Sequence, residues 1–368
     1  MDRIRSLVHQ HVSSATVLLE LRAALPLWPS LWSQAALARE VLAFDPAYPL
    51  SVRYYRYLLK VIMKDIESSI NSSGADVDCD ECGIDDSLAE LVVNSQLLVD
   101  DVDDTCYMRF NTPAAGNGAT NEVKIQVFRS HNQVGCRLWD AGLFMSAFLI
   151  GNYNALRGKR VVELGAGVGM SAITYAVSAA ASEMQCTPAS VVITDFHSDV
   201  LLLIKSNIKL NKHLFPSTNV TTAKVDWFDL LGLSEAIPHP PDFIFAADCT
   251  YSSELHGGLV DTVKDLLHRP GRLKVAKGCV EDASFRMDSF LADRFVARDS
   301  SDAVPLCMIA SCRRTEDTYG AFLDVLAAKG ETLGSVDVTQ WALGRSVDRL
   351  YHYNHIDLLR IRLIVPVE

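Results

Sequence analysis

The chain has 368 residues, of which 49% are hydrophobic and 21% charged, and its formal net charge at pH 7 is −11. This length allows two domains with sizeable cores, and the acidic balance argues against a protein that binds nucleic acid by neutralising phosphates. The 9 cysteines are scattered, and neither a signal peptide nor a membrane-spanning segment is visible. We therefore expect a cytoplasmic protein with reduced thiols that acts on a protein or a small molecule, with no nucleic-acid or membrane partner.

Residues 1–110 are predicted to form a helical N-terminal domain. Apolar residues recur there at helical spacing, as from Val17 to Leu21. Two prolines in residues 45–50 interrupt this pattern, and the following Ser51 is suited to cap a helix that begins at the next residue. This half of the chain is thus expected to contribute helices rather than a sheet.

Two breaks interrupt the N-terminal third. Residues 70–86 are acidic and small, which predicts a loop. The loop contains a Cys79-x-x-Cys82 pair, but no second Cys or His pair follows at zinc-site spacing, so we assign no metal. Residues 111–120 are rich in Gly, Ala, Asn and Thr and are expected to separate strands or domains.

From residue 120 to residue 368 the pattern changes to short apolar runs that alternate with helical stretches. Such alternation is typical of an α/β domain whose parallel sheet is covered on both faces. The expected strands are 160–164, 191–195, 220–226, 242–248, 305–311 and 356–366, and the expected helices are 140–151, 169–182, 198–211, 253–268 and 315–329. Residues 269–303 are read as an insertion at the periphery of the sheet.

A glycine turn follows the first of these strands. Gly165, Gly167 and Gly169 stand between the strand and a helical stretch, and such a turn lets the backbone approach a ligand at a helix N-terminus. A dinucleotide site requires G-x-G-x-x-G, but the third position here is Met170. Glu163, two residues before the first glycine, also does not suit a pyrophosphate. The turn therefore predicts a nucleotide-type cofactor other than a dinucleotide, unless it only joins strand to helix.

Carboxylates and aromatic residues end the next two strands. Asp195 stands 28 residues after Gly167, where an acid at a strand tip can accept hydrogen bonds from ribose hydroxyls. Asp226 can accept a hydrogen bond from the amine of an adenine, and Trp227 can stack on the adenine ring. Phe196 is a weaker candidate for contact with the same face of the ring. The alternatives are a helix cap for the acid and core packing for the tryptophan.

The strand over 242–248 is expected to lead to the reaction site, because ligands of open α/β sheets lie beyond the carboxyl ends of the strands. Asp248 and Tyr251 lie there, and a carboxylate and a phenol can orient an amine by hydrogen bonds. Cys249 has no basic partner in this motif, so we expect no nucleophilic role. Arg313 and Arg314 follow a strand toward the same edge, and we assign them no function.

These motifs together resemble the seven-strand protein-lysine methyltransferases that carry a D-x-x-Y motif, and most of all the group that modifies translation elongation factor 2. The residues that carry the resemblance are Trp139-Asp140-Ala141, Val162 through Gly169, Thr194 through Ser198, Asp226-Trp227 and Ala247 through Tyr251. Members of that group also have a helical N-terminal extension.

The resemblance implies a Rossmann-like class I methyltransferase sheet of seven strands, with the last strand reversed in a hairpin, and S-adenosylmethionine as cofactor. It implies cofactor contacts for Trp139, Gly165, Ala166, Gly167, Asp195, Trp227 and Ala247. From the motifs themselves we add Glu163, Gly169, Phe196 and Asp226 as cofactor-binding candidates. Asp248 and Tyr251 would orient the target lysine, and the protein substrate would be elongation factor 2. Three alternatives stay open: a methyltransferase of the same fold with another substrate, a non-catalytic interaction protein that retains the fold and, more remotely, a nicotinamide dehydrogenase.

Overall fold

A computed structural model describes the chain in two compact units. The described residues are 1–72, 83–99, 104–114, 119–129, 133–182, 187–276, 279–280, 286–290, 303–346, 351–353 and 356–368. The first unit comprises Met1–Asn111 and Lys124–Gln133, and the second comprises Thr112–Val123 and Val134–Glu368. Most of the predicted acidic loop, with its Cys79-x-x-Cys82 pair, lies outside the described residues.

The first unit is mostly helical, as predicted, but it also includes strand residues 105–111 and 124–128, where no sheet was expected before residue 111. Its helices are α1 (Asp2–His9), α2 (Ser14–Ala24), α3 (Leu31–Glu40), α4 (Val52–Ser72) and α5 (Asp86–Leu97). The hydroxyl of Ser51 accepts a hydrogen bond from the backbone N–H of Tyr54 at 3.2 Å, which confirms the predicted cap of α4. Apolar side chains from all five helices, among them Leu7, Leu21 and Leu58, form one buried core.

A two-stranded sheet follows these helices. Its strands are β1 (Thr105–Pro113) and β2 (Thr120–Phe128). The break predicted over 111–120 thus separates two strands, and the boundary between the units runs through them. The helical spacing of the preceding residues does not continue into β1, where buried residues instead alternate with half-buried or exposed ones toward its end.

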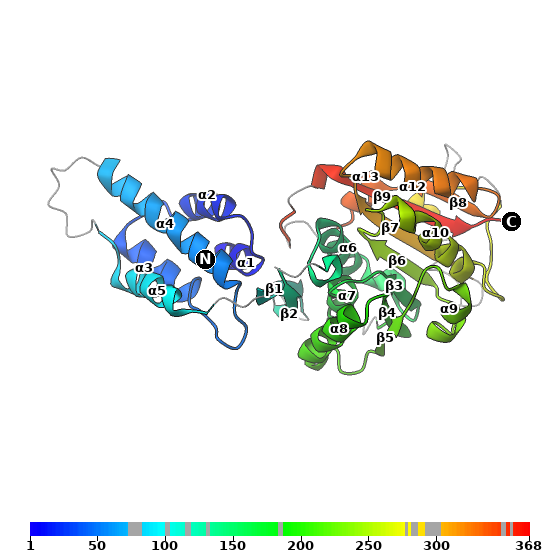
Figure 1. The fold of residues 1–368 in the computed structure, drawn as a ribbon, viewed down its shortest axis with the longest axis horizontal. Coiled ribbons are helices and arrows are strands. Elements are labelled where there is room, and N and C mark those ends of the chain that lie inside the picture. The colour runs from blue at the N-terminus through cyan, green and yellow to red at the C-terminus, as the bar shows by residue number, and fades with distance from the viewer. Residues whose placement is uncertain are drawn as a thin grey trace. The chain divides into compact units, whose positions relative to one another are not determined.

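The second unit contains a seven-stranded sheet in the order β5-β4-β3-β6-β7-β9-β8 (Figure 1). The strands are β3 (Arg160–Leu164), β4 (Ser190–Asp195), β5 (Val220–Lys224), β6 (Phe243–Ala247), β7 (Leu306–Cys312), β8 (Leu333–Asp337) and β9 (Leu359–Pro366). The first five pair in parallel, and β9 is antiparallel to both β7 and β8. This order confirms the Rossmann-like sheet with a reversed last strand.

The sequence pattern missed β8. Its five residues include Gly334, Ser335 and Asp337, which have low strand propensity. Among the strands that the structure describes, β8 lies at the edge of the sheet and pairs with β9 alone, so fewer of its side chains need to be apolar. The run therefore lacked the continuous hydrophobicity that identified the buried strands.

Helices cover both faces of the sheet. They are α6 (Asp140–Gly151), α7 (Met170–Ala181), α8 (Ser198–Asn211), α9 (Leu230–Ala236), α10 (Ser253–Leu267), α11 (Met287–Phe290), α12 (Glu316–Ala328) and α13 (Thr339–Leu343), with short 3-10 turns at Val134–Cys136, Tyr153–Leu156, Lys212–Leu214 and Ile356–Leu358. Val162 and Ile244 belong to one core cluster with α10 and α12, whereas α6, α7 and α8 pack on the other strand faces. The five helices predicted for this unit are confirmed.

The first residues of the predicted insertion pair with the sheet instead of lying only at its periphery. Val275 forms a parallel bridge to Val367, and its backbone N–H donates to the carbonyl of Pro366 at 3.0 Å. Much of residues 277–302 lies outside the described residues, so the predicted insertion is only partly described.

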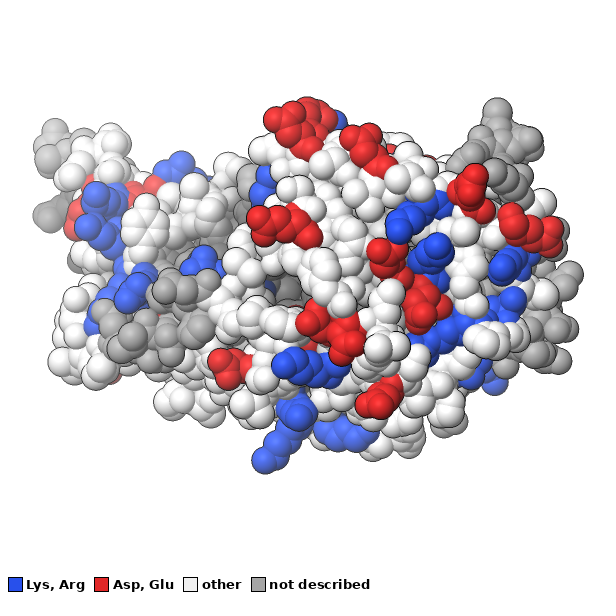
Figure 2. Space-filling model, turned by 45° about the vertical axis from the view of Figure 1, so that its right-hand side comes forward, with Lys and Arg blue, Asp and Glu red and all other residues white. Residues whose placement is uncertain are grey.

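The surface carries charges of both signs. On the face drawn in Figure 2, acidic and basic side chains are interspersed among uncharged areas. Among the helices that the structure describes, none is both long and apolar enough to span a bilayer.

A buried ion cluster joins the amino ends of β3 and β6. The carboxylate of Asp242, 1% exposed, accepts the backbone N–H of Arg160 at 2.7 Å, and an Arg272 guanidinium nitrogen lies 2.7 Å from its other oxygen. We expect Asp242→Ala to lower the free energy of unfolding by about 3–5 kcal/mol, because it leaves a buried charge without its partner. The urea midpoint measures this loss.

The matched control for that variant is Asp265→Ala. Asp265 pairs with Arg269 one helical turn away and its side chain is 37% exposed, so its loss should cost less than about 1 kcal/mol. Equal urea midpoints for the two variants would contradict a structural role of the Asp242 cluster.

Candidate functional site

The carboxyl ends of β3, β4, β5 and β6 surround a cavity of about 600 Å³. A volume of this size suits a cofactor or small ligand. Twelve of the predicted site residues line it: Trp139, Glu163, Gly165, Ala166, Gly167, Asp195, Phe196, Asp226, Trp227, Ala247, Asp248 and Tyr251. Residues far apart in the sequence thus meet at the edge where the topology places ligands.

Gly165 and Gly167 must be glycines for two independent reasons. Their φ angles are +60° and +56°, in the left-handed region that most side chains avoid. A Cβ on Gly165 would lie 2.7 Å from the sulfur of Cys249 and 3.1 Å from the indole of Trp227, and one on Gly167 would lie 3.0 Å from the carbonyl oxygen of Gly135. The turn therefore presents bare backbone to the cavity.

Gly169, the last glycine of the turn, was also predicted to contact the cofactor. Gly169 is the N-cap of α7 with φ +75°, and a Cβ there would meet Ile204 and Ile173. It does not line the cavity. The start of α7 and the close packing of α8 explain why this position is glycine. A sequence motif alone cannot distinguish these causes from contact with a ligand.

Asp195 and Glu163 place two buried carboxyl groups on the cavity wall. Asp195 accepts the backbone N–H groups of Gly167 and His197, each at 3.1 Å, and Glu163 accepts that of Ala172 at 3.3 Å. Burial raises the pKa of Asp195, and burial raises the pKa of Glu163 to about 8. The acidic wall is therefore only partly charged near neutral pH.

This raised pKa predicts a pH-dependent stability. Between about pH 4.5 and 8, folded Glu163 keeps a proton that the unfolded chain has lost. The contribution of this carboxyl group to the free energy of unfolding is therefore complete below that range and disappears as pH rises through it. Replacing Glu163 by glutamine should flatten the decline in unfolding free energy by up to about 1.4 kcal/mol per pH unit. Urea titrations from pH 5 to 8 measure the slope.

The exposed Glu235→Gln variant serves as the control, and its slope should match that of the unmodified protein. An unchanged slope in Glu163→Gln would contradict a protonated Glu163.

Aromatic side chains also line the cavity. The ring of Trp227 lies against Gly165, and the carboxylate of Asp226 accepts the N–H of Phe228 at 2.9 Å, which fixes the loop after β5. Phe196 is 47% exposed, and the ammonium nitrogen of Lys224 lies 5.2 Å from its ring centroid. A flat ring could be held between such groups.

Asp248 leaves β6 with φ +58°, a conformation that asparagine and aspartate tolerate better than most residues. Its backbone N–H donates to the carbonyl of Ala310 at 2.8 Å, and its carboxylate accepts the N–H of Cys312 at 3.3 Å. The hydroxyl of Thr250 donates to that of Ser311 at 2.7 Å. Strand β7 thus holds the start of this loop in place.

Tyr251 and Cys249 differ in what they can contribute. Tyr251 is 50% exposed at the cavity, and burial together with nearby negative groups raises the pKa of its hydroxyl, which therefore stays protonated. Cys249 is 4% exposed and directs its sulfur toward the carbonyl of Leu164 at 3.4 Å. Burial raises the pKa of this thiol well above its ordinary value, which disfavours the reactive thiolate.

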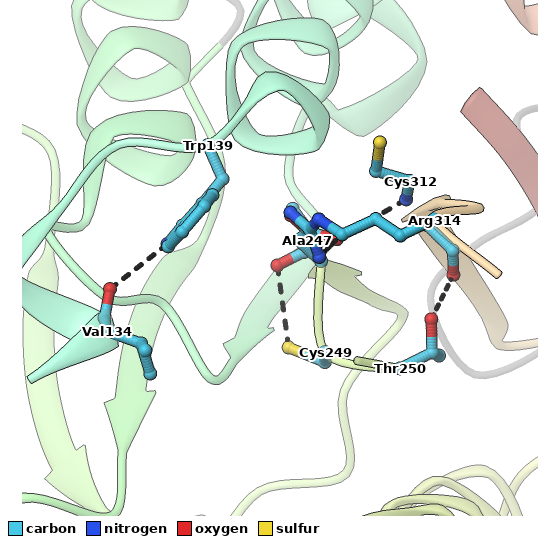
Figure 3. A network of polar contacts seen from close by, with 9 residues as sticks. Val134, Trp139, Ala247, Cys249, Thr250, Cys312 and Arg314 are labelled. Atoms are coloured by element: carbon cyan, nitrogen blue, oxygen red, sulfur yellow. Dashed lines mark hydrogen bonds and ion pairs between the residues drawn. The ribbon is translucent and has the colours of Figure 1, made fainter. Parts of the chain in front are cut away.

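Arg314, to which the sequence assigned no role, also lines the cavity. Its guanidinium nitrogen lies 2.5 Å from a carboxylate oxygen of Asp248, and its central carbon lies 5.0 Å from the ring centroid of Trp139. The indole N–H of Trp139 donates to the carbonyl of Val134 at 3.0 Å (Figure 3). The only signal in the sequence was its place two residues after β7, at the edge where β6 also ends.

The chain has counterparts among known proteins. Residues 118–283 match a family described as lysine methyltransferases. The chain is 36% identical over 129 residues to calmodulin-lysine N-methyltransferase of Arabidopsis thaliana, and the aligned segment covers 35% of this chain and 40% of that protein. It is 28% identical over 224 residues to protein-lysine N-methyltransferase EEF2KMT of Mus musculus, and this alignment covers 59% of this chain and 60% of that protein.

One solved structure among the matches is an O-methyltransferase from Bacillus cereus in complex with SAH, with a TM-score of 0.35, 14% identity and coverage of 60% of this chain and 80% of that one. The chain spans about half the length of the curated relatives that it matches. The family match includes the glycine turn and the ends of β4, β5 and β6. Residues 118–283 of the chain are thus similar to lysine methyltransferases.

Proposed function

We propose that this protein is an S-adenosylmethionine-dependent protein-lysine N-methyltransferase that modifies translation elongation factor 2. The observation that carries the proposal is the cavity itself, where a glycine turn suited to a nucleotide-type cofactor meets the Asp248 to Tyr251 loop suited to an amine. Its match to the lysine methyltransferase family supports the same reaction.

The cavity residues fit the cofactor. Bare backbone at Gly165 and Gly167 leaves the space that a Cβ would fill, and Ala166 and Trp139 also line the cavity. Asp195 has free lone pairs for the ribose hydroxyls besides the two backbone N–H bonds that it accepts. Trp227 would cover the adenine, with Asp226 and Phe196 beside it, and Glu163 and Ala247 would complete the wall.

When bound, the cofactor supplies a methyl group on a sulfonium, which is transferred as the C–S bond breaks and the N–C bond forms. The chain's own residues must then hold a neutral amine in line with that carbon and exclude water. The protonated hydroxyl of Tyr251 can donate to the amine or to a water molecule, and Asp248 can accept an amine N–H. The proton released from nitrogen leaves through water at the half-exposed Tyr251.

The substrate proposal depends on the relatives and on the first unit. The relative named EEF2KMT aligns over 224 residues, and the helical unit offers a second surface for a large folded substrate. We place the reaction in the cytoplasm, and the free thiols of Cys106, Cys136, Cys249, Cys279, Cys307 and Cys312 suit a reducing compartment.

A labelling experiment tests the proposal. The purified protein is incubated with tritiated S-adenosylmethionine and either elongation factor 2 or calmodulin, the latter because of the relative that carries its name. We expect label on elongation factor 2, with peptide mass spectrometry giving the lysine and the number of methyl groups. Label on calmodulin alone would contradict the proposal that elongation factor 2 is the substrate. A calorimetric titration that shows no binding of S-adenosylmethionine would contradict the proposal that the protein is a methyltransferase.

A further inference from the structure

The guanidinium of Arg314 takes both oxygens of the Asp248 carboxylate. One nitrogen lies 2.5 Å from Oδ2 and the other 3.3 Å from Oδ1, which is the two-pronged geometry in which arginine binds carboxylates. The Asp248 side chain is 5% exposed, whereas that of Arg314 is 44% exposed. A partly exposed cation therefore covers a carboxylate that little solvent reaches.

The same guanidinium lies on the face of Trp139, 5.0 Å from the ring centroid. A carboxylate next to an aromatic face forms a binding site for a cation. The indole N–H of Trp139 is bonded to the carbonyl of Val134, so the ring is held in orientation. The ammonium of a lysine is also a cation, so the carboxylate of Asp248 and the ring of Trp139 can hold it too.

The loop that bears Asp248 does not depend on Arg314 for its shape. The carboxylate accepts the Cys312 N–H, and the backbone N–H of Asp248 is bonded to Ala310. Farther along the loop, a ring nitrogen of the buried His256 lies 3.1 Å from the carbonyl oxygen of Thr250. Arg314 therefore acts on the charge of the site rather than on its backbone.

We propose that Arg314 is an internal occupant of the acceptor site, which the substrate lysine must displace from Asp248 and Trp139 before it can be methylated. This inference rests on the proposed function, because it identifies the acceptor end of the same cavity. The guanidinium occupies both oxygens of Asp248 and lies over the ring of Trp139, so it must swing outward as the lysine enters. The site thereby remains neutral when no substrate is bound.

Binding of butylammonium, a mimic of the lysine side chain, tests this competition without cofactor or turnover. In calorimetric or ligand-observed NMR titrations of the full chain, Arg314→Gln should bind it at least tenfold more tightly than the unmodified protein. Arg314→Met, which is also neutral, should behave in the same way if the first variant folds poorly. Arg314→Lys, which keeps a cation, should not gain affinity.

Arg313→Gln is the matched control. Arg313 pairs with Glu316 at 2.8 Å and does not line the cavity, so its variant loses the same charge elsewhere and should bind butylammonium like the unmodified protein. Adding Asp248→Asn to Arg314→Gln should abolish the gain. Equal affinity in all proteins, or no binding by the neutral variants, would overturn the inference.

A separate calorimetric titration with S-adenosylmethionine distinguishes this inference from the proposed function. If the cofactor binds and neutral variants at position 314 gain no affinity for butylammonium, only the role of Arg314 is wrong. If the unmodified protein does not bind the cofactor, the proposed function fails whatever the butylammonium result.

Discussion

Replacing Asp248 by asparagine is expected to lower kcat for the protein substrate by about 10²- to 10⁴-fold, the range typical of a lost acid or base group. Asparagine retains the size of aspartate and tolerates φ +58°, so the loop should keep its shape. It cannot offer the paired carboxylate oxygens that would hold the amine. Steady-state kinetics with elongation factor 2 and tritiated cofactor measure the loss.

The affinity for S-adenosylmethionine separates a lost acceptor contact from a damaged cavity. We expect the affinity of Asp248→Asn for the cofactor to lie within about threefold of that of the unmodified protein, because Asp248 lies at the acceptor end. A threefold change corresponds to a difference in binding free energy of about 0.7 kcal/mol. Asp195→Asn should show the opposite pattern, with cofactor affinity lowered most. Near-normal turnover by Asp248→Asn would place the reaction elsewhere.

Hydrophobic periodicity was sufficient for most of the second unit. The helices over 140–151 and 198–211 begin and end where the sequence predicted, because α6 and α8 are bounded by clear changes from polar to apolar residues. The parallel strands β3, β4 and β6 are short apolar runs buried on both faces. The sequence alone therefore predicts that their carboxyl ends lie at one edge of the sheet.

What the sequence could not show were the partners that the fold brings together. Arg314 meets Asp248 across 66 residues, and no periodicity or local motif encodes such a pair. The Gly135 carbonyl approaches Gly167 from a 3-10 turn that has no ligand-binding signature of its own. The sequence thus predicted the acid and the amine-binding loop, whereas the cation that covers the acid needed the register of β6 and β7.

Replacing Gly165 by alanine is expected to weaken S-adenosylmethionine binding by at least about tenfold, or 1.4 kcal/mol. The added Cβ would lie 2.7 Å from the sulfur of Cys249 and 3.1 Å from Trp227, so the turn or the tryptophan must move away from its present position. Both form the wall that the cofactor would touch. Calorimetry measures the affinity, and the urea midpoint reports the accompanying loss of stability.

Gly158→Ala separates backbone strain from the loss of space. Gly158 has φ +69°, close to the +60° of Gly165, but a Cβ there meets nothing within 4 Å. Both variants should lose about 1–2 kcal/mol of unfolding free energy from the left-handed conformation, yet only Gly165→Ala should lose cofactor affinity. Equal affinities in the two variants would show that the cofactor does not depend on the close approach of this turn to Cys249 and Trp227.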